Sequence, residues 1–153
     1  MLGFTQITND IVFPSVTNIG GNAFYSCTNV QYVAFPNAIK IKDNVFNCSR
    51  AASWSNVKLE RLQIGDCIES VGVNTFYKAR GLTTIEFVTD EEDWIAAWNN
   101  HPVLPNWLGP ATSTEIEGEA TLTPFTTRPE TYYSNTDYPK PTKLVLVRRN
   151  TIQ

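Results

Sequence analysis

The sequence predicts a short repeat solenoid rich in β-strand, followed by a capping helix and an extended C-terminal arm. Three observations support this architecture. Phenylalanines recur 22 residues apart, once as Phe13 and Phe35 and again as Phe24 and Phe46. Strand-like apolar positions recur with them, and seven of the nine prolines lie between residues 101 and 142. We therefore expect a solenoid of about three coils, a helix and an arm, at residues 1–90, 90–99 and 100–153.

The strand of each coil repeats one apolar spacing. Three segments share it: Val30-x-x-Val33-x-Phe35, Leu59-x-x-Leu62-x-Ile64 and Leu82-x-x-Ile85-x-Phe87. Because successive side chains of a strand point to opposite faces, the last two apolar residues of each segment lie on one face. Coils that stack side by side place such strands about 4.8 Å apart in a single sheet.

Two further apolar positions recur in each coil. Ile19, Ile41 and Val71 occupy one, and Phe24, Phe46 and Phe76 occupy the other. We expect these side chains to cover the apolar face of the strands, with the three phenylalanines in one column. A single coil cannot bury its own apolar side, so neighbouring coils must complete the core. The wider gap between the last two phenylalanines predicts an insertion within residues 47–58, which contain Trp54.

Residues 19–36 combine these features in one continuous motif. They read Ile19-Gly20-Gly21-Asn22-Ala23-Phe24-Tyr25-Ser26-Cys27-Thr28-Asn29-Val30-Gln31-Tyr32-Val33-Ala34-Phe35-Pro36. This motif resembles the BspA-like, or Treponema-type, leucine-rich repeats, and the resemblance extends over about residues 7–90. The resemblance implies a right-handed solenoid that recognises proteins or cell surfaces, usually in a secreted or surface-attached chain.

A short helix is expected directly after the coils. Thr89 or Asp90 is the expected N-cap, and the acidic residues that follow suit the positive end of the helix dipole. Trp94 and Trp98 are four residues apart and therefore share one side of the helix. The helix suits a lid over the last coil, which the resemblance also implies. The alternative is that the two tryptophans form a ligand platform.

The remaining arm combines prolines with aromatic anchors. Proline disfavours regular helix between residues 101 and 142. The apolar side chains are too numerous for a disordered linker: Trp107, Leu108, Phe125, Tyr132, Tyr133 and Tyr138. Residues 143–149 predict a strand. We expect the arm to pack on the solenoid or to add its strand to a neighbouring chain, with Tyr132 and Tyr133 as candidate partner contacts.

Composition narrows the classes of partner. A net charge of −3 and a pI near 5.1 argue against nucleic acid, and the lack of a long apolar run argues against a membrane span. Three cysteines without a CxxC pair, beside a single histidine, make a zinc site or a disulfide framework improbable. No signal peptide is visible, which favours cytoplasmic synthesis and incorporation into an assembly over secretion.

The sequence predicts no catalytic residue, no metal site and no cofactor. His101 is the single imidazole, and Cys67 is the thiol for which it is the candidate base. Cys67 lies between the core positions Ile64 and Val71, however, so we expect a buried, inert thiol. Alternating acids at Glu115, Glu117 and Glu119 are typical of a solvated face rather than of paired catalytic carboxylates.

The strand residues between the apolar positions are expected to point away from the core. They form a candidate recognition face that comprises Tyr32, Ala34, Arg61, Gln63, Thr84 and Glu86. Solenoids use such faces to bind other proteins, although a plain solvated face is the alternative. Trp54, in the insertion, either folds back or contacts a partner.

These observations favour a non-catalytic protein–protein interaction module whose partners are other protein subunits in a homo- or hetero-oligomer. Three coils form a slab only about 15 Å thick, and its ends need neighbours or caps. The leading hypothesis is a structural component of a larger assembly such as a bacteriophage virion. The alternative, which the resemblance implies, is a bacterial cell-surface adhesin or host-binding fragment.

Overall fold

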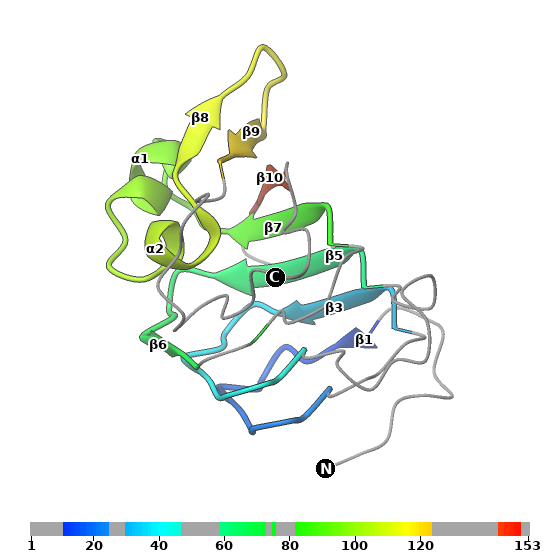
Figure 1. Ribbon diagram of the computed structural model, residues 1–153. Helices are drawn as coiled ribbons and strands as arrows, with labels where there is room; N and C mark the ends of the chain where they lie inside the picture. Colours follow the sequence, from blue (N-terminus) through cyan, green and yellow to red (C-terminus); the bar gives the residue numbers. More distant parts are fainter. Residues whose placement is uncertain are drawn as a thin grey trace.

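The computed structural model describes residues 11–24, 30–46, 59–72, 75, 82–123 and 144–150. Within them lie a seven-stranded and a three-stranded sheet (Figure 1). The larger sheet has the order β1 (Ile11–Val12), β3 (Tyr32–Phe35), β5 (Arg61–Gly65), β7 (Thr84–Val88), β10 (Leu144–Arg149), β9 (Glu119–Leu122) and β8 (Ala111–Ser113). The smaller sheet has the order β2 (Asn18–Ile19), β4 (Lys40–Ile41) and β6 (Ser70–Val71).

The strands from β1 to β7 are parallel and follow the predicted repeat. Val33 pairs with Leu62, which pairs with Ile85, so equivalent positions of successive coils lie side by side. Strand β1 extends the series, because Ile11 pairs with Val33. The predicted alignment of the three apolar segments is therefore confirmed, and the fold is a solenoid-like stack of mostly parallel strands.

The second apolar position of each coil builds the smaller sheet. Ile19 pairs with Ile41, and Ile41 pairs with Val71, as the repeat predicts. The rings of Phe24 and Phe46 stack with centroids 5.5 Å apart and an interplanar angle of 18°. Both phenylalanines are buried in the core cluster. The third phenylalanine of the expected column, residue 76, lies outside the described residues.

A recurring asparagine shapes the turn before each of these phenylalanines. Asn22 and Asn44 have φ angles of 62° and 61°, in the left-handed region that asparagine tolerates better than other side chains with a Cβ. The backbone N–H of Asn22 donates to the carbonyl oxygen of Asp43 over 3.0 Å. This hydrogen bond joins one turn to the next, so the turns stack in step with the strands.

Helix α1 (Trp94–Asn99) begins later than expected. Its N-cap is Asp93, whose carboxylate accepts a hydrogen bond from the N–H of Ala96 over 3.2 Å. The expected cap at Thr89 or Asp90 is therefore wrong. Thr89 instead accepts from the N–H of Glu91 over 3.2 Å, which forms a turn ahead of the helix. The carboxylate nearest the first helical turn is the one that caps it.

A second helix, α2 (Leu104–Leu108), lies where proline was expected to exclude regular helix. Pro105 stands in its first turn, where backbone N–H groups lack helical partners and proline is tolerated. Trp107 is buried and its indole N–H donates to Thr75 over 3.1 Å. Trp98 of α1 is also buried, and its indole N–H donates to the Gly109 carbonyl over 3.0 Å.

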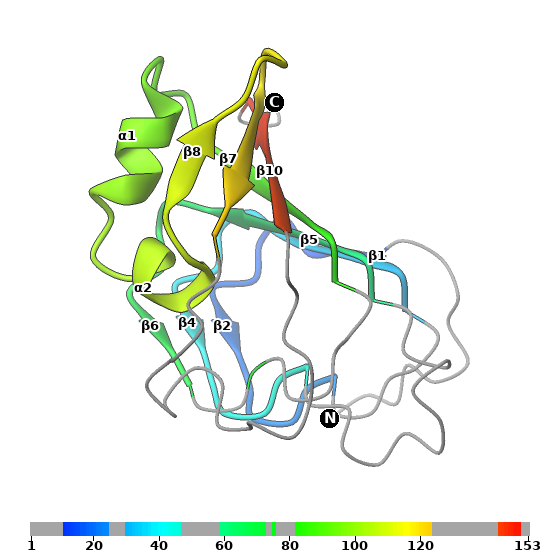
Figure 2. The same ribbon diagram turned by 45° about the horizontal axis from the view of Figure 1, so that its top comes forward.

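The two helices extend the core of the coils. The Trp98 ring contacts Phe87 of β7 edge-on, with centroids 5.2 Å apart. Figure 2 shows α1 and α2 together with the β8–β9 hairpin at one end of the stack. Among the described helices, none is long and apolar enough to cross a membrane.

Strand β10 comes from the far end of the chain and lies in the middle of the sheet. It pairs in parallel with β7, where Leu146 lies opposite Ile85, and antiparallel with β9, where Leu146 lies opposite Ala120. Leu144 and Leu146 are fully buried. In this structure the strand expected near residues 143–149 thus lies on its own chain, in the position that follows the last coil.

Candidate interaction surface

The side of the large sheet that faces away from the core, here called the outer face, is continuous across the coils and the C-terminal strands. Strand pairing puts six outer-face residues in one row: Tyr32, Arg61, Thr84, Val145, Thr121 and Thr112. A second row contains Ala34, Gln63, Glu86, Val147 and Glu119. The rows follow from the alternation of side chains along each strand.

Glu86 is the centre of a group of polar side chains on this face. Its Oε1 accepts hydrogen bonds from the hydroxyl of Tyr32 over 2.9 Å and from the amide of Gln63 over 3.0 Å. Its Oε2 forms an ion pair with Arg61, and Nε of Arg149 lies 3.4 Å from Oε1. We call these five residues, which come from four strands, the polar cluster.

The polar cluster keeps Glu86 charged despite its burial. Burial alone would raise the pKa of Glu86, but hydrogen bonds from Gln63, Arg61 and Tyr32, together with the charge of Arg149, hold the pKa below its ordinary value. Burial and the hydrogen bond to Glu86 raise the pKa of Tyr32. The tyrosine hydroxyl therefore stays protonated as a donor, and the carboxylate remains a charged acceptor.

The ion pair with Glu86 and the ring of Tyr32 also fix the orientation of the Arg61 side chain. The guanidinium of Arg61 lies over the ring of Tyr32, 4.8 Å from its centroid. The side chain of Arg61 is 44% exposed, whereas that of Glu86 is 2% exposed. An arginine held by a buried carboxylate and an aromatic ring presents its guanidinium in one orientation, which favours binding because little side-chain freedom remains to be lost.

The residues predicted to point away from the core differ in their exposure to solvent. Ala34, Gln63 and Glu86 are buried, and of the predicted residues Tyr32, Arg61 and Thr84 reach solvent. The long side chains beside them give the physical reason, since arginine and tyrosine cover neighbouring short or paired groups. Three predicted contacts, Trp54, Tyr132 and Tyr133, lie outside the described residues.

Arg149 belongs to the cluster but was not among the predicted residues. It lies opposite Val88 because β10 pairs with β7. Pairing between such distant segments leaves no local pattern in the sequence. The one feature that pointed to Arg149 was its place in a basic pair directly after the apolar segment 144–147. The cluster also contains one unpartnered acceptor, because Oε1 of Gln63 is buried without a hydrogen bond among the described residues.

His101 has a structural role at the start of α2. Its Nδ1 accepts hydrogen bonds from the N–H groups of Val103 over 3.0 Å and Leu104 over 3.2 Å. Its Nε2, which then bears the hydrogen, donates to the carbonyl oxygen of Asp66 over 3.0 Å. Both ring nitrogens are therefore engaged with the backbone in this structure.

Cys67 is exposed, so the expectation that it is buried is wrong. Its neighbour Ile68 turns into the core instead. Partial burial raises the pKa of the Cys67 thiol, and the adjacent carboxylate of Asp66 raises it further. A thiol of this kind holds little thiolate at neutral pH and is a poor nucleophile. Within the described residues, no group of three His, Cys, Asp or Glu side chains is placed to hold a metal ion.

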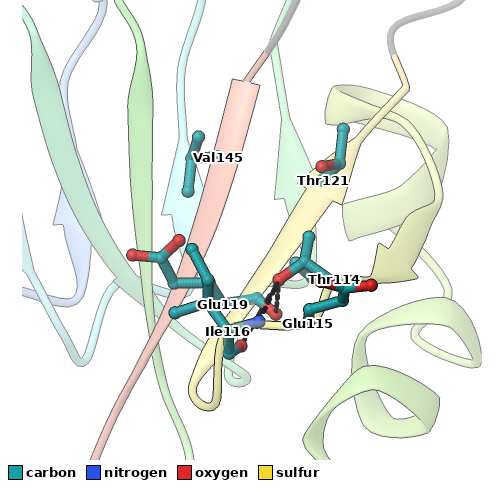
Figure 3. Close-up of a pocket in the computed structure, with 7 residues that line it drawn as sticks. Thr114, Glu115, Ile116, Glu119, Thr121 and Val145 are labelled. Atoms are coloured by element: carbon teal, nitrogen blue, oxygen red, sulfur yellow. Dashed lines mark hydrogen bonds between the residues drawn. The ribbon is translucent and has the colours of Figure 1, made fainter.

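The outer face ends in a hollow at the β8–β9 hairpin (Figure 3). The hollow has a volume of about 330 Å³, and its lining includes Thr114, Glu115, Ile116, Glu119, Thr121 and Val145. Two of these residues, Thr121 and Val145, belong to the first row of the outer face. We call this feature the hairpin hollow.

Comparison with known proteins identifies one match. The family described as "BspA type Leucine rich repeat region (6 copies)" matches residues 3–93, which is more than half of the chain. No curated protein and no solved structure matches.

Proposed function

The chain belongs to the BspA-type leucine-rich repeat family, and on this premise we propose that it is a non-catalytic protein–protein interaction module that binds through its outer face. Its partners are other protein subunits. Repeats of this kind suit such a role because stacked coils align equivalent residues into an extended surface.

The polar cluster is the observation that supports this proposal most strongly. Arginine and tyrosine are enriched among the residues that dominate binding energy at protein interfaces. Arg61 and Tyr32 combine exposure with a fixed orientation, because both are tied to the buried carboxylate of Glu86. A sheet face that contacts only solvent would not need a buried carboxylate that is paired with two arginines.

A non-catalytic role agrees with the chemistry of His101 and Cys67, the candidate catalytic pair. Both nitrogens of His101 contact backbone groups, so the ring has no free acceptor for the Cys67 proton. The raised pKa of the Cys67 thiol opposes nucleophilic catalysis as well.

The finer proposal is that this chain is a structural component of a larger assembly, with a bacteriophage particle as the setting. The first strand of the seven-stranded sheet supports this proposal. Among the described strands β1 pairs with β3 alone, and Val12 on its outer face is half exposed. Another protein subunit at this end would bury that apolar side chain. We also propose that α1 and α2 cap the opposite end of the stack.

Immunogold labelling with an antibody to the purified chain tests the setting. Label on particles released from the producing cells supports the virion component. Label restricted to the cell envelope supports the alternative, a surface adhesin, which family membership favours. Label on neither structure contradicts both proposals.

Substitution of the polar cluster tests the binding surface. Arg61→Ala should reduce incorporation of the chain into the labelled structure, because it removes one of the two exposed arginines of the cluster. Lys42→Ala is the matched control, since Lys42 is an exposed cation near the smaller sheet. Equal incorporation of the two variants would show that the polar cluster is not the contact.

A further inference from the structure

The turn of the β8–β9 hairpin holds one large apolar side chain in solvent. Ile116 is 60% exposed, and besides Val12 it is the only large hydrophobic side chain in the described residues to be strongly exposed. A single exposed apolar side chain is not by itself evidence of a contact, but Ile116 also lines the hairpin hollow, where it offers an apolar surface to a partner.

The turn is rigidly built around Ile116. The hydroxyl of Thr114 accepts from the N–H of Ile116 over 3.2 Å and lies 3.2 Å from the Glu119 carbonyl oxygen, to which it can donate (Figure 3). Gly118 has a φ of 80°, and its carbonyl oxygen accepts from the N–H of Arg148 over 2.8 Å. The hairpin turn is thus anchored to β10, and Ile116 is held out by the backbone rather than by a flexible loop.

Carboxylates surround the exposed isoleucine. Glu115 and Glu119 line the hairpin hollow, and Glu117 lies in the same turn. None of the three forms an ion pair within the described part of the chain, where the ion pairs present both involve Glu86. The arginines of β10 are directed elsewhere, because Arg149 faces Glu86 and Arg148 donates to the carbonyl oxygen of Glu91 over 3.2 Å.

The hairpin hollow is continuous with the surface already proposed to bind protein. Val145 in the hollow pairs with Thr84, which pairs with Arg61 of the polar cluster. The outer face therefore carries arginine at the polar cluster and carboxylates, Glu115 and Glu119, where it ends in the hairpin hollow. A partner that spans this face meets positive charge at one position and negative charge at the other.

We propose that the hairpin hollow binds a segment of a partner protein in which a lysine or arginine stands next to an apolar side chain. The apolar side chain packs on Ile116 and Val145, and the cation lies between Glu115 and Glu119. Charge complementarity selects this occupant, because the described lining offers two carboxylates and no cation. The inference rests on the proposed function, since it names the chemistry that one end of the outer face selects.

Nuclear magnetic resonance of the full, nitrogen-15-labelled chain tests the inference. The probe is a short peptide that alternates lysine with leucine, compared with a peptide that alternates glutamate with leucine and one that alternates lysine with serine. Only the lysine–leucine peptide should produce saturable shifts, and these should be confined to the amides of the β8–β9 hairpin and of Val145 beside it. Ile116→Ser and Glu119→Gln should each weaken its binding by about tenfold, the equivalent of about 1.4 kcal/mol.

Glu69→Gln is the matched control, because Glu69 is an exposed acid on the part of the coil next to β6. It should leave peptide binding unchanged. The inference is overturned if the lysine–leucine peptide shifts no hairpin amide, if its shifts spread over acidic residues throughout the surface, or if Ile116→Ser has no effect. Arg61→Ala separates the two proposals. If the peptide still binds the hairpin hollow but Arg61→Ala leaves incorporation unchanged, only the proposed polar-cluster surface is contradicted.

Discussion

Tyr32 on β3 donates its hydroxyl hydrogen to Oε1 of Glu86 on β7 over 2.9 Å, although strand β5 lies between them. The amide of Gln63 on β5 donates both to the same carboxylate oxygen and to the tyrosine hydroxyl, over 3.0 and 2.9 Å. Three coils of the solenoid are therefore joined on their outer face by side chains as well as by backbone hydrogen bonds.

Glu86→Gln should destabilise the protein at neutral pH and reduce its sensitivity to acid. The folded-state pKa of Glu86 is lowered, so its charged form stabilises the fold above the unfolded pKa of about 4.3, and this stability is lost as pH falls through the folded pKa. We expect a loss of about 1.5–3 kcal/mol at pH 7, typical of hydrogen bonds to a charged group.

Urea unfolding followed by circular dichroism between pH 7 and pH 3 measures the effect. The difference in unfolding free energy between the wild type and Glu86→Gln should shrink as the pH falls below about 4.3. A difference that stays constant over this range would show that Glu86 is not held charged by its neighbours.

Gly72→Ala should destabilise the solenoid, whereas Gly20→Ala should not. The two glycines follow the equivalent residues Val71 and Ile19 of different coils. A Cβ at Gly72 would lie 2.5 Å from the backbone nitrogen of Asp43, whereas a Cβ at Gly20 meets nothing within 4 Å. Overpacking of this kind costs about 1–3 kcal/mol. Equal unfolding midpoints of the two variants in urea would contradict the close stacking of the third coil on the second.

His101→Ala should destabilise α2 and its packing on the coils, because it removes the acceptor for two backbone N–H groups. The expected cost is about 1–2 kcal/mol, as for loss of a helix cap. His101→Asn is the control, since the asparagine Oδ1 occupies nearly the position of the lost Nδ1 and can accept the same hydrogen bonds. Thermal unfolding should rank the wild type first, then Asn, then Ala, and an Asn variant no better than Ala would argue against the capping role.

Asn99→Ala should expose the free edge of β8. The Asn99 side chain accepts from the N–H of Ala111 over 2.8 Å and donates to the carbonyl oxygen of the same residue over 2.9 Å. These bonds occupy the backbone groups that an added strand would use, and such protection limits edge-to-edge association. Light scattering over a range of concentrations should show stronger self-association of the variant. An unchanged association constant, with the fold intact, would mean that other features protect this edge.

The repeat could be predicted from the sequence because its apolar spacing itself encodes the strand register. Val33, Leu62 and Ile85 occupy the same position of their coils, and the same residues pair across the sheet. The place of β10 could not be predicted, since pairing of Leu146 with Ile85 depends on two segments that are distant in sequence. A strand-like pattern identifies a strand but not its neighbour.

The binding surface was predicted only in part for a related reason. Alternation along β5 and β7 places Gln63 and Glu86 on the outer face, but it does not reveal what covers them. Their burial depends on ion pairing and hydrogen bonding with Arg61, Tyr32 and the distant Arg149. The rigid turn around Ile116 also left little signal, apart from the Gly118 that permits a positive φ.

The central claim is that the coils and β10 form one sheet, since the proposed surface spans both. Native-state hydrogen exchange of the full chain measures this directly. The hydrogen-bonded amides of β5, β7 and β10 should open with the same free energy and the same dependence on denaturant, because they belong to one cooperative unit. Amides of β10 that exchange much faster than those of β5 and β7, through a separate opening, would contradict the claim.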